Sequence, residues 1–141
     1  MSVFDNIVVG AADSEGGERA FRRALALTQA TGGTLHIVAA VDTKRDSKAV
    51  PWLPEEFRYT SFGAGATDWL LMRLQKEAAD AHVNVATHPV LDDPAGAIAR
   101  VAAEEGADLV VVGSGSAHGG RSLAHVPKAV MDHVGCAVLV V

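Results

Sequence analysis

The chain of 141 residues carries a net charge of −5, and 49% of its residues are hydrophobic while only 5% are aromatic. We expect one domain over residues 1–141, in which small aliphatic side chains pack helices onto a parallel sheet. Because no basic cluster exceeds two residues, a nucleic-acid surface is disfavoured. No apolar run approaches the roughly 20 residues of a membrane span, and the start MSVFDN does not read as a secretory signal. We therefore expect a cytoplasmic protein without a membrane span.

The first part of the chain predicts a strand, a helix and a second strand. Asn6–Ala11 is a short apolar run that fits a strand buried on both faces. Ser14 can cap the helix that follows, and apolar residues recur there at helical spacing: Ala20, Phe21, Ala24, Leu25 and Thr28. Gly32–Gly33 end this helix, and Thr34–Val41 is the second predicted strand.

The connection Asp42–Ala66 shows no clear period and contains two prolines and two glycines. A connection this long is typical of a functional or partner-binding segment, and we expect it to be the most mobile part of the chain. It carries four aromatic side chains, Trp52, Phe57, Tyr59 and Phe62. They could form a lid or a surface for an unidentified protein partner, or they could pack onto Trp69 as a small second core.

Helical spacing returns from Thr67, with an apolar stripe of Leu70, Leu71, Leu74 and Ala78. Val83–Leu91 alternates as a strand, and Pro89 predicts that this strand lies near a sheet edge. Asp93–Pro94 is a helix cap followed by proline at the first helical position. Gly106 supplies the left-handed residue that ends this third helix, whose inward side is Ala97, Ile98, Val101 and Ala102.

The last part of the chain predicts two strands around a short helix. Leu109–Val112 is the most apolar strand, a helix covers about Val126–His133 and ends at Gly135, and Ala137–Val141 is the fifth strand. Five strands alternating with four helices predict an open parallel α/β sheet with right-handed crossovers. Ligands bind such sheets at the carboxyl ends of strands where the winding direction reverses.

If the chain winds outward from its first strand and then restarts beside it, strands one and four flank that crevice. The loops at this place are Ala11–Gly17 and Gly113–Ser122. Glycines in the second loop would let backbone N–H groups approach a phosphate, although a flexible turn without a ligand has the same composition. Asp13 with Ser14 could hold ribose or a metal, but such a pair more often only caps the next helix.

Four segments, in order, resemble one family over the whole chain: NIVVGAADSEGGERAF, LHIVAAVD, DDPAGAIARVAAEEGADLVVVGS and HVGCAVLVV. The chain resembles the universal stress proteins. The resemblance implies a Rossmann-like sheet with strand order 3-2-1-4-5, which agrees with the winding argued above. It also implies a regulatory stress-response role, frequent homodimers, and a division between members that bind ATP and members that do not.

ATP-binding members of this family carry, after the fourth strand, a motif of Gly, two residues, Gly, nine residues, Gly, and Ser or Thr. Gly113 occupies the first position of this motif, but Ser116 occupies the second glycine position. When nine residues are counted onward from Ser116, the Gly–Ser position of the motif falls on Val126–Pro127. When the closing strand is aligned instead, it falls on Ala124–His125 and the loop is two residues short. Neither alignment preserves the motif.

The adenine-side aspartate of such members also has no direct counterpart, because Ala12 occupies its position and the acid follows at Asp13. A shift of one residue in an extended segment turns a side chain to the opposite face. We therefore expect an altered or degraded nucleotide or anion site that binds ATP weakly or binds no cofactor. Its candidate residues are Ala12, Asp13, Val41, Gly113, Ser114, Ser116, Gly119, Gly120, Arg121 and Ser122. The alternative is an ATP-binding switch in which nucleotide reshapes the loop Gly113–Ser122.

No residue pattern predicts an enzyme or a metal site. The six histidines have no i, i+4 spacing and the single cysteine, Cys136, excludes a thiolate cluster, so we expect no structural metal. Between a helix end and a strand that we expect to be buried, Cys136 is expected to be an inert core thiol. Phosphorylation of Asp13 is disfavoured because such a site needs a lysine just after the fifth strand. The strand Ala137–Val141 has neither charge nor proline, which predicts a homodimer through this sheet edge.

Overall fold

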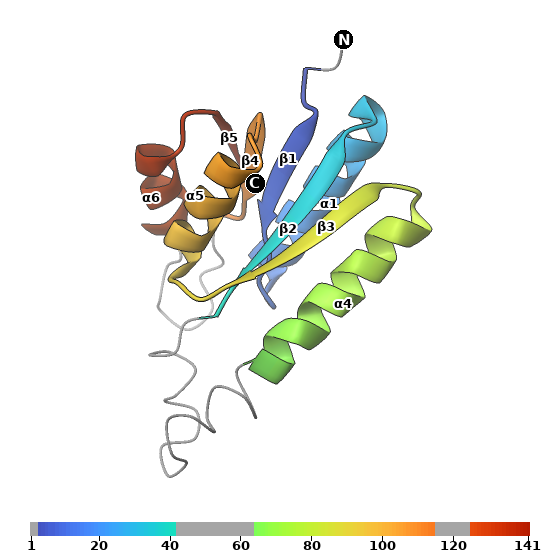
Figure 1. Cartoon of the computed structure of the whole chain (residues 1–141), viewed down its shortest axis with the longest axis horizontal. Coiled ribbons are helices and arrows are strands. Elements are labelled where there is room, and N and C mark those ends of the chain that lie inside the picture. Colours follow the sequence, from blue (N-terminus) through green and yellow to red (C-terminus); the bar gives the residue numbers. More distant parts are fainter. Residues whose placement is uncertain (1–2, 42–63, 115–124) are drawn as a thin grey trace.

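The computed structural model describes residues 3–41, 64–114 and 125–141, and strands and helices alternate along these parts of the chain (Figure 1). The elements in order are β1 (Asn6–Gly10), α1 (Glu15–Thr31), β2 (Thr34–Ala40), α4 (Ala64–Asp80), β3 (Asn84–Val90), α5 (Pro94–Glu104), β4 (Leu109–Val112), α6 (His125–His133) and β5 (Ala137–Val140). The predicted connection Asp42–Ala66 lies outside the described residues except where α4 begins.

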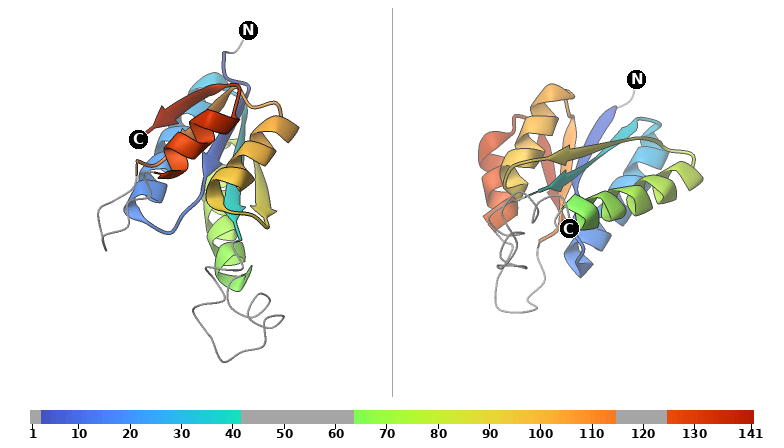
Figure 2. Two further views of the ribbon diagram at one scale, coloured as in Figure 1. Left: turned by 90° about the vertical axis from the view of Figure 1, so that its left-hand side faces the viewer. Right: turned by 60° about the horizontal axis from the view of Figure 1, so that its bottom comes forward.

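The five strands form one parallel sheet in the order β3-β2-β1-β4-β5, which confirms the predicted α/β topology. In the centre of the sheet, Ile7 of β1 pairs with Leu35 of β2 on one side and with Leu109 of β4 on the other. Figure 2 shows from two further sides that the helices cover both faces of the sheet. Among the helices of the described residues, none has the length and apolarity needed to cross a membrane.

Alternate residues of the strands supply two cores, one on each face of the sheet. Ile7 and Val9 face α1 and α4, where Phe21 is among the largest fully buried side chains. Val8 faces α5 and α6 and packs in the same cluster as Val101. This period of two follows from the pleat of a strand and explains why β1 and β4 are apolar at every central position.

The predicted helix caps are confirmed. The Ser14 hydroxyl accepts a hydrogen bond from the Gly17 amide at 3.1 Å, and the Asp93 carboxylate accepts one from the Gly96 amide at 2.7 Å. At its other end α1 stops at Gly32, which has a φ of 75°, and Gly106 has a φ of 61° after α5. Glycine adopts this left-handed conformation without the steric cost of a Cβ.

Some predicted element boundaries were wrong. α4 begins at Ala64 rather than at Thr67, because the small residues of its first turn have no apolar period to mark them. β4 has the predicted bounds, whereas the other four strands end one residue earlier than predicted. After β1, β2 and β5 the next residue still donates one backbone hydrogen bond to a neighbouring strand, from Ala11 to Val38, from Val41 to Val90 and from Val141 to Val112.

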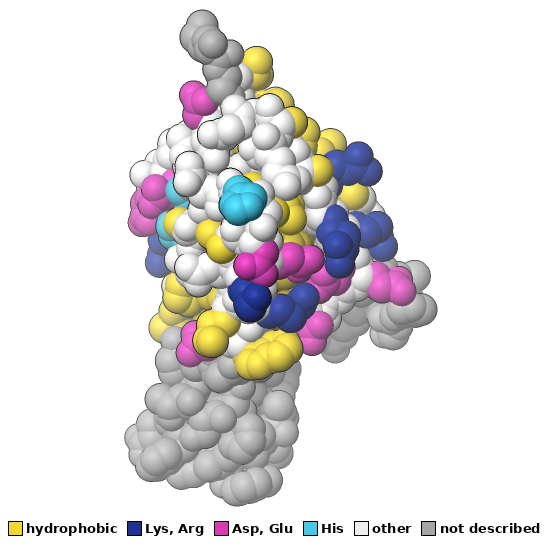
Figure 3. Space-filling model, turned by 90° about the vertical axis from the view of Figure 1, so that its right-hand side faces the viewer, with side chains coloured by type: hydrophobic (Ala, Val, Ile, Leu, Met, Phe, Trp, Pro, Cys, Tyr) yellow, Lys and Arg dark blue, Asp and Glu magenta, His cyan; other side chains and the backbone are white. Residues whose placement is uncertain are grey.

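Ion pairs link the helices on the face of the sheet that α1 and α4 cover. Arg22 of α1 lies 3.7 Å from Glu77 of α4, and Arg73 of α4 pairs with Glu18 of α1. On the face seen in Figure 3, basic and acidic side chains are interleaved and do not form a patch of one sign. On this face of the described residues, the basic side chains therefore lie beside acidic ones.

Candidate functional site

The predicted crevice lies between β1 and β4, which are neighbours in the sheet. From β1 the chain winds outward through β2 to β3, whereas from β4 it winds in the other direction to β5, so the winding reverses between these two strands. The residues that follow their carboxyl ends are Ala11–Ser14 after β1, and Gly113 and Ser114 after β4. Reversal points of this kind are the usual ligand sites of open α/β sheets.

The backbone around Gly113 is packed directly against the first turn of α1. A Cβ atom at Gly113 would lie 2.5 Å from the carbonyl oxygen of Gly16, closer than real Cβ contacts. On the same turn, a Cβ at Gly17 would overlap the carbonyl oxygen of Ala12. Both glycines are therefore required by contacts within the protein, so Gly113 does not by itself indicate a ligand. A ligand at this crevice would lie beyond this closed contact.

Three other candidate residues have defined places at the strand ends. The Ser114 amide donates to the Val141 carbonyl at 2.8 Å, so this N–H group is part of the sheet and is not available to an anion. Val41, after β2, is 4% exposed and belongs to the core. Asp13 is exposed, directly before the cap residue Ser14. The remaining candidates lie outside the described residues: Ser116, Gly119, Gly120, Arg121 and Ser122.

The amino end of α1, which points into the crevice region, is rich in carboxylates. Glu15 and Glu18 lie in its first turn, and Asp13 precedes it. The hydrogen bond from Arg73 to Glu18 raises the pKa of Arg73, and the nearby charge of Asp13 raises it further. These acids complement the positive end of the helix dipole, which would otherwise favour a bound anion. The arrangement disfavours a ligand with several negative charges beside α1.

In the described part of the chain, no group of three or more His, Cys, Asp or Glu side chains is placed to hold a metal ion. The structure does bring two histidines together, which the sequence analysis missed. His36 Nδ1 lies 3.0 Å from His88 Nε2, and His36 Nε2 lies 3.1 Å from Asn6 Oδ1. In the sequence, each of these histidines lies on a predicted strand. Whether their side chains meet depends on the register of the two strands, which pairs Val38 with His88 and could not be predicted.

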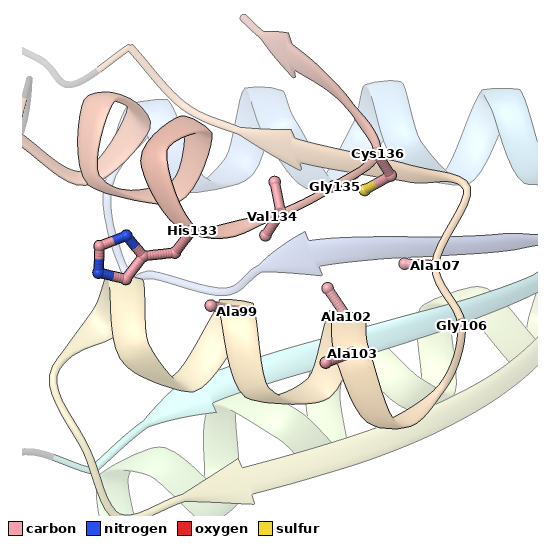
Figure 4. Close-up of a pocket in the computed structure, with 9 residues that line it drawn as sticks. All are labelled: Ala99, Ala102, Ala103, Gly106, Ala107, His133, Val134, Gly135 and Cys136. Atoms are coloured by element: carbon pink, nitrogen blue, oxygen red, sulfur yellow. The ribbon is translucent and has the colours of Figure 1, made fainter.

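A shallow pocket of about 180 Å³ lies on the α5–α6 face, beside the amino end of β5 and away from the crevice (Figure 4). Its lining is mostly alanine, glycine and valine, with His133 and Cys136 at its edges. It is smaller than the roughly 300–1,000 Å³ of typical ligand sites. Cys136 is half-buried beside the exposed strand β5, not beside a buried strand as predicted, and burial raises the pKa of its thiol.

Comparison with known proteins identifies the family to which this fold belongs. The model of the universal stress protein family matches residues 4–141. Universal stress protein Rv1636 of Mycobacterium tuberculosis is 31% identical over 144 residues, which cover 100% of this chain and 98% of that protein.

Two solved structures show how closely the folds agree. The crystal structure of a universal stress protein in complex with cAMP is 31% identical, with a TM-score of 0.73 and coverage of 99% and 98% of the two chains. Universal stress protein UspA from Lactobacillus plantarum shares the fold at 24% identity, with a TM-score of 0.76 and coverage of 96% of each chain. The chain therefore belongs to the universal stress protein family.

Proposed function

We propose that this protein acts by binding and not by catalysis, and that its crevice is an altered nucleotide site that holds cAMP in preference to Mg-ATP. The observation that carries the proposal is the acidic amino end of α1, where the exposed Asp13 and Glu15 lie at the helix start that follows β1. The 31% identical relative of known structure, which aligns over nearly the whole chain, is a complex with cAMP. That relative makes a cyclic mononucleotide a ligand to test in this crevice.

The charges of cAMP and ATP are the reason why we expect the crevice to bind cAMP more tightly than Mg-ATP. A cyclic phosphodiester carries one negative charge, whereas a triphosphate carries several and needs donors along its whole length. The amide of Ser114 is used by the sheet, and Gly113 is occupied by its contact with α1. Where ATP-binding members place Gly–Ser for the distal phosphates, this chain has Ala124–His125 or Val126–Pro127. A ligand with a single phosphate needs none of these distal contacts.

The expected weakening of ATP binding follows from the loss of two kinds of contact, one to the adenine and one to the phosphates. The net value of one hydrogen bond is about 0.5–1.5 kcal/mol, and more when its partner stays buried and unpaired. Loss of the adenine-side acid together with displaced phosphate donors would weaken ATP binding by about a hundredfold, at about 1.4 kcal/mol for each tenfold. We propose an ATP dissociation constant no better than high micromolar, with residual anion binding at Gly119, Gly120 and Arg121.

Isothermal titration calorimetry of the full chain with cAMP, AMP and Mg-ATP tests this proposal. We expect cAMP to bind at least about tenfold more tightly than Mg-ATP, which corresponds to about 1.4 kcal/mol. The double variant Asp13→Asn, Glu15→Gln should improve Mg-ATP binding more than cAMP binding, because it removes two charges beside α1. Glu104→Gln, at the far end of α5, is the matched control.

Three results would contradict the proposal. A low-micromolar dissociation constant for Mg-ATP would favour the alternative, an ATP-dependent switch. Adenine nucleotide found by mass spectrometry in freshly purified, denatured protein identifies the ligand directly, and ATP in that sample would have the same meaning. No saturable heat at two temperatures with any of the three nucleotides would show that the crevice binds no nucleotide of this class.

We also propose that the protein forms a two-fold homodimer through residues Ala137–Val141. The support is that β5 is a sheet edge without charge or proline, on which Leu139 is 36% and Val140 is 42% exposed. An apolar edge of this kind is a template for pairing with another strand, and a second copy of the same edge can meet it antiparallel.

A further inference from the structure

The strand β3 forms the other edge of the sheet and is held there unequally on its two faces. It pairs with β2 over seven residues, from Thr34 with Asn84 to Ala40 with Val90. On one face it packs against α4, as its place beside that helix in Figure 1 also shows. No residue of β3 is fully buried. Side-chain contacts with β2 on the face opposite α4 are therefore important for holding this edge in place.

Histidines from the two strands make such a contact. His36 of β2 is 4% exposed and His88 of β3 is half-buried, and their rings are 5.2 Å apart at their centres and tilted by 39°. The register places His88 opposite Val38, so the two histidines are diagonal neighbours on one face. A nitrogen of each ring faces the other at 3.0 Å, a hydrogen-bonding distance.

Asn6 of β1 fixes which ring nitrogen carries the proton. The carbonyl oxygen of its side chain lies 3.1 Å from His36 Nε2, so Nε2–H donates to it. In the neutral pair the other nitrogen of His36, Nδ1, is then an acceptor, and His88 Nε2–H donates to it. Each facing nitrogen is satisfied when both rings are neutral, and the contact links three adjacent strands through their side chains.

The pair keeps its hydrogen bond when it gains one proton, because one ring can donate while the other accepts. A second proton leaves two N–H groups facing each other across 3.0 Å, with two positive charges and no acceptor between them. Opening of β3 would relieve this conflict, because it would separate the rings and expose His36 to water. We infer that His36 and His88 form a proton-sensitive tether that holds edge strand β3 on β2 and releases it in acid.

The surroundings of His36 determine the direction of the effect. Burial lowers the pKa of His36 from its ordinary value of 6.5, the neighbouring His88 lowers it further, and Glu105 at the end of α5 opposes these effects. Of the elements packed around it, β1 contributes the neutral Asn6, β3 contributes His88 and α5 contributes Glu105. The carboxylate of Glu105 therefore raises the pKa of His36, whereas burial and the charge of His88 lower it.

The sign of the pH dependence follows from this lowered pKa. Below pH 6.5 the opened state, with His36 in water, binds more protons than the closed state. The contribution of the tether is complete above pH 6.5 and is lost as the pH falls from 6.5 through the lowered pKa of His36. Each unit of lowering increases the opening constant by about tenfold at acid pH.

Hydrogen exchange of backbone amides, measured by NMR between pH 7.5 and 5 and corrected for intrinsic rates, tests the inference on the full chain. We expect the protection of β3 amides to fall by about tenfold or more over this range. The amides of β4, whose four residues are all buried, should lose much less. An equal loss in β3 and β4 would mean that acid acts on global stability, and no loss in β3 would mean that there is no tether. Either result overturns the inference.

Two variants separate the tether from a general effect of histidine. In His88→Gln, the side-chain amide can still donate to His36 Nδ1 but carries no charge, so the acid-induced loss in β3 should shrink several-fold. His82→Asn is the matched control, because His82 is exposed, lies in the turn before β3 and has a φ of 60°, which asparagine tolerates. This control should keep the full wild-type acid response. A wild-type response in His88→Gln would also overturn the inference.

Discussion

Substitution of Gly113 by alanine tests whether this glycine serves the fold or a ligand. The added Cβ would lie 2.5 Å from the carbonyl oxygen and 2.7 Å from the carbonyl carbon of Gly16. Both are backbone atoms in the first turn of α1, so no side chain can rotate away, and ordinary contact requires a shift of nearly an ångström. Such overpacking costs about 1–3 kcal/mol. With a urea dependence of about 2 kcal/mol per molar, the unfolding midpoint of Gly113→Ala should fall by about 1 M.

The assay is urea unfolding at pH 7.5 without nucleotide, followed by circular dichroism. Gly135→Ala is the matched control, because no atom of a residue other than Gly135 and its two chain neighbours lies within 4 Å of a Cβ built there. The free energy of unfolding of this control should stay within about 0.5 kcal/mol of the wild type. If Gly113→Ala also stays within that range, the backbone contact does not require glycine. In that case, close approach of a ligand becomes the better explanation for Gly113.

Two further predictions concern the sheet edge and the start of the central strands. Val138→Lys together with Val140→Lys places charge on β5 and should yield monomers or insoluble protein, whereas a wild-type chain that sediments as a monomer at micromolar concentration contradicts the dimer. Asp108→Ala removes the carboxylate that accepts the amides of Asp5 and Asn6 at 2.8 and 2.9 Å, and it should cost about 1–3 kcal/mol in urea unfolding. Asp108→Asn, which keeps an acceptor oxygen, should lose less, and equal losses in both variants would refute this reading.

The parts of the fold that could be predicted from the sequence depend on local interactions. Ser14 and Asp93 cap their helices through amides three residues away, so the capping residue and its target are visible in one short segment. Gly32 and Gly106 end helices for an equally local reason. The strand order followed from alternation, handedness and one restart of the winding, which are general properties of parallel sheets. The family resemblance gave the same order independently.

The parts that could not be predicted depend on contacts between distant segments. The pairing of His36 with His88 requires the register of β2 and β3, and a shift of one residue would place the two rings on opposite faces. The contact of Gly113 with Gly16 requires the distance between β4 and α1. The use of the Ser114 amide by β5 likewise becomes visible only when the last strand is in place. In each case the sequence shows the residue, but the residue that it contacts becomes known only from the fold.

These contacts change which residues can report on the ligand of the crevice. Gly113 matches the first position of the nucleotide motif, yet the fold alone requires a glycine there, so that match carries little information about binding. The positions that can distinguish between nucleotides are those whose side chains are not required for packing. Asp13 is exposed, and Glu15 lies in the first turn of α1, so each can be neutralised without disturbing the core. A change in the ratio of cAMP to Mg-ATP affinity in these variants therefore measures the electrostatics of the crevice, whereas a glycine variant would measure packing first.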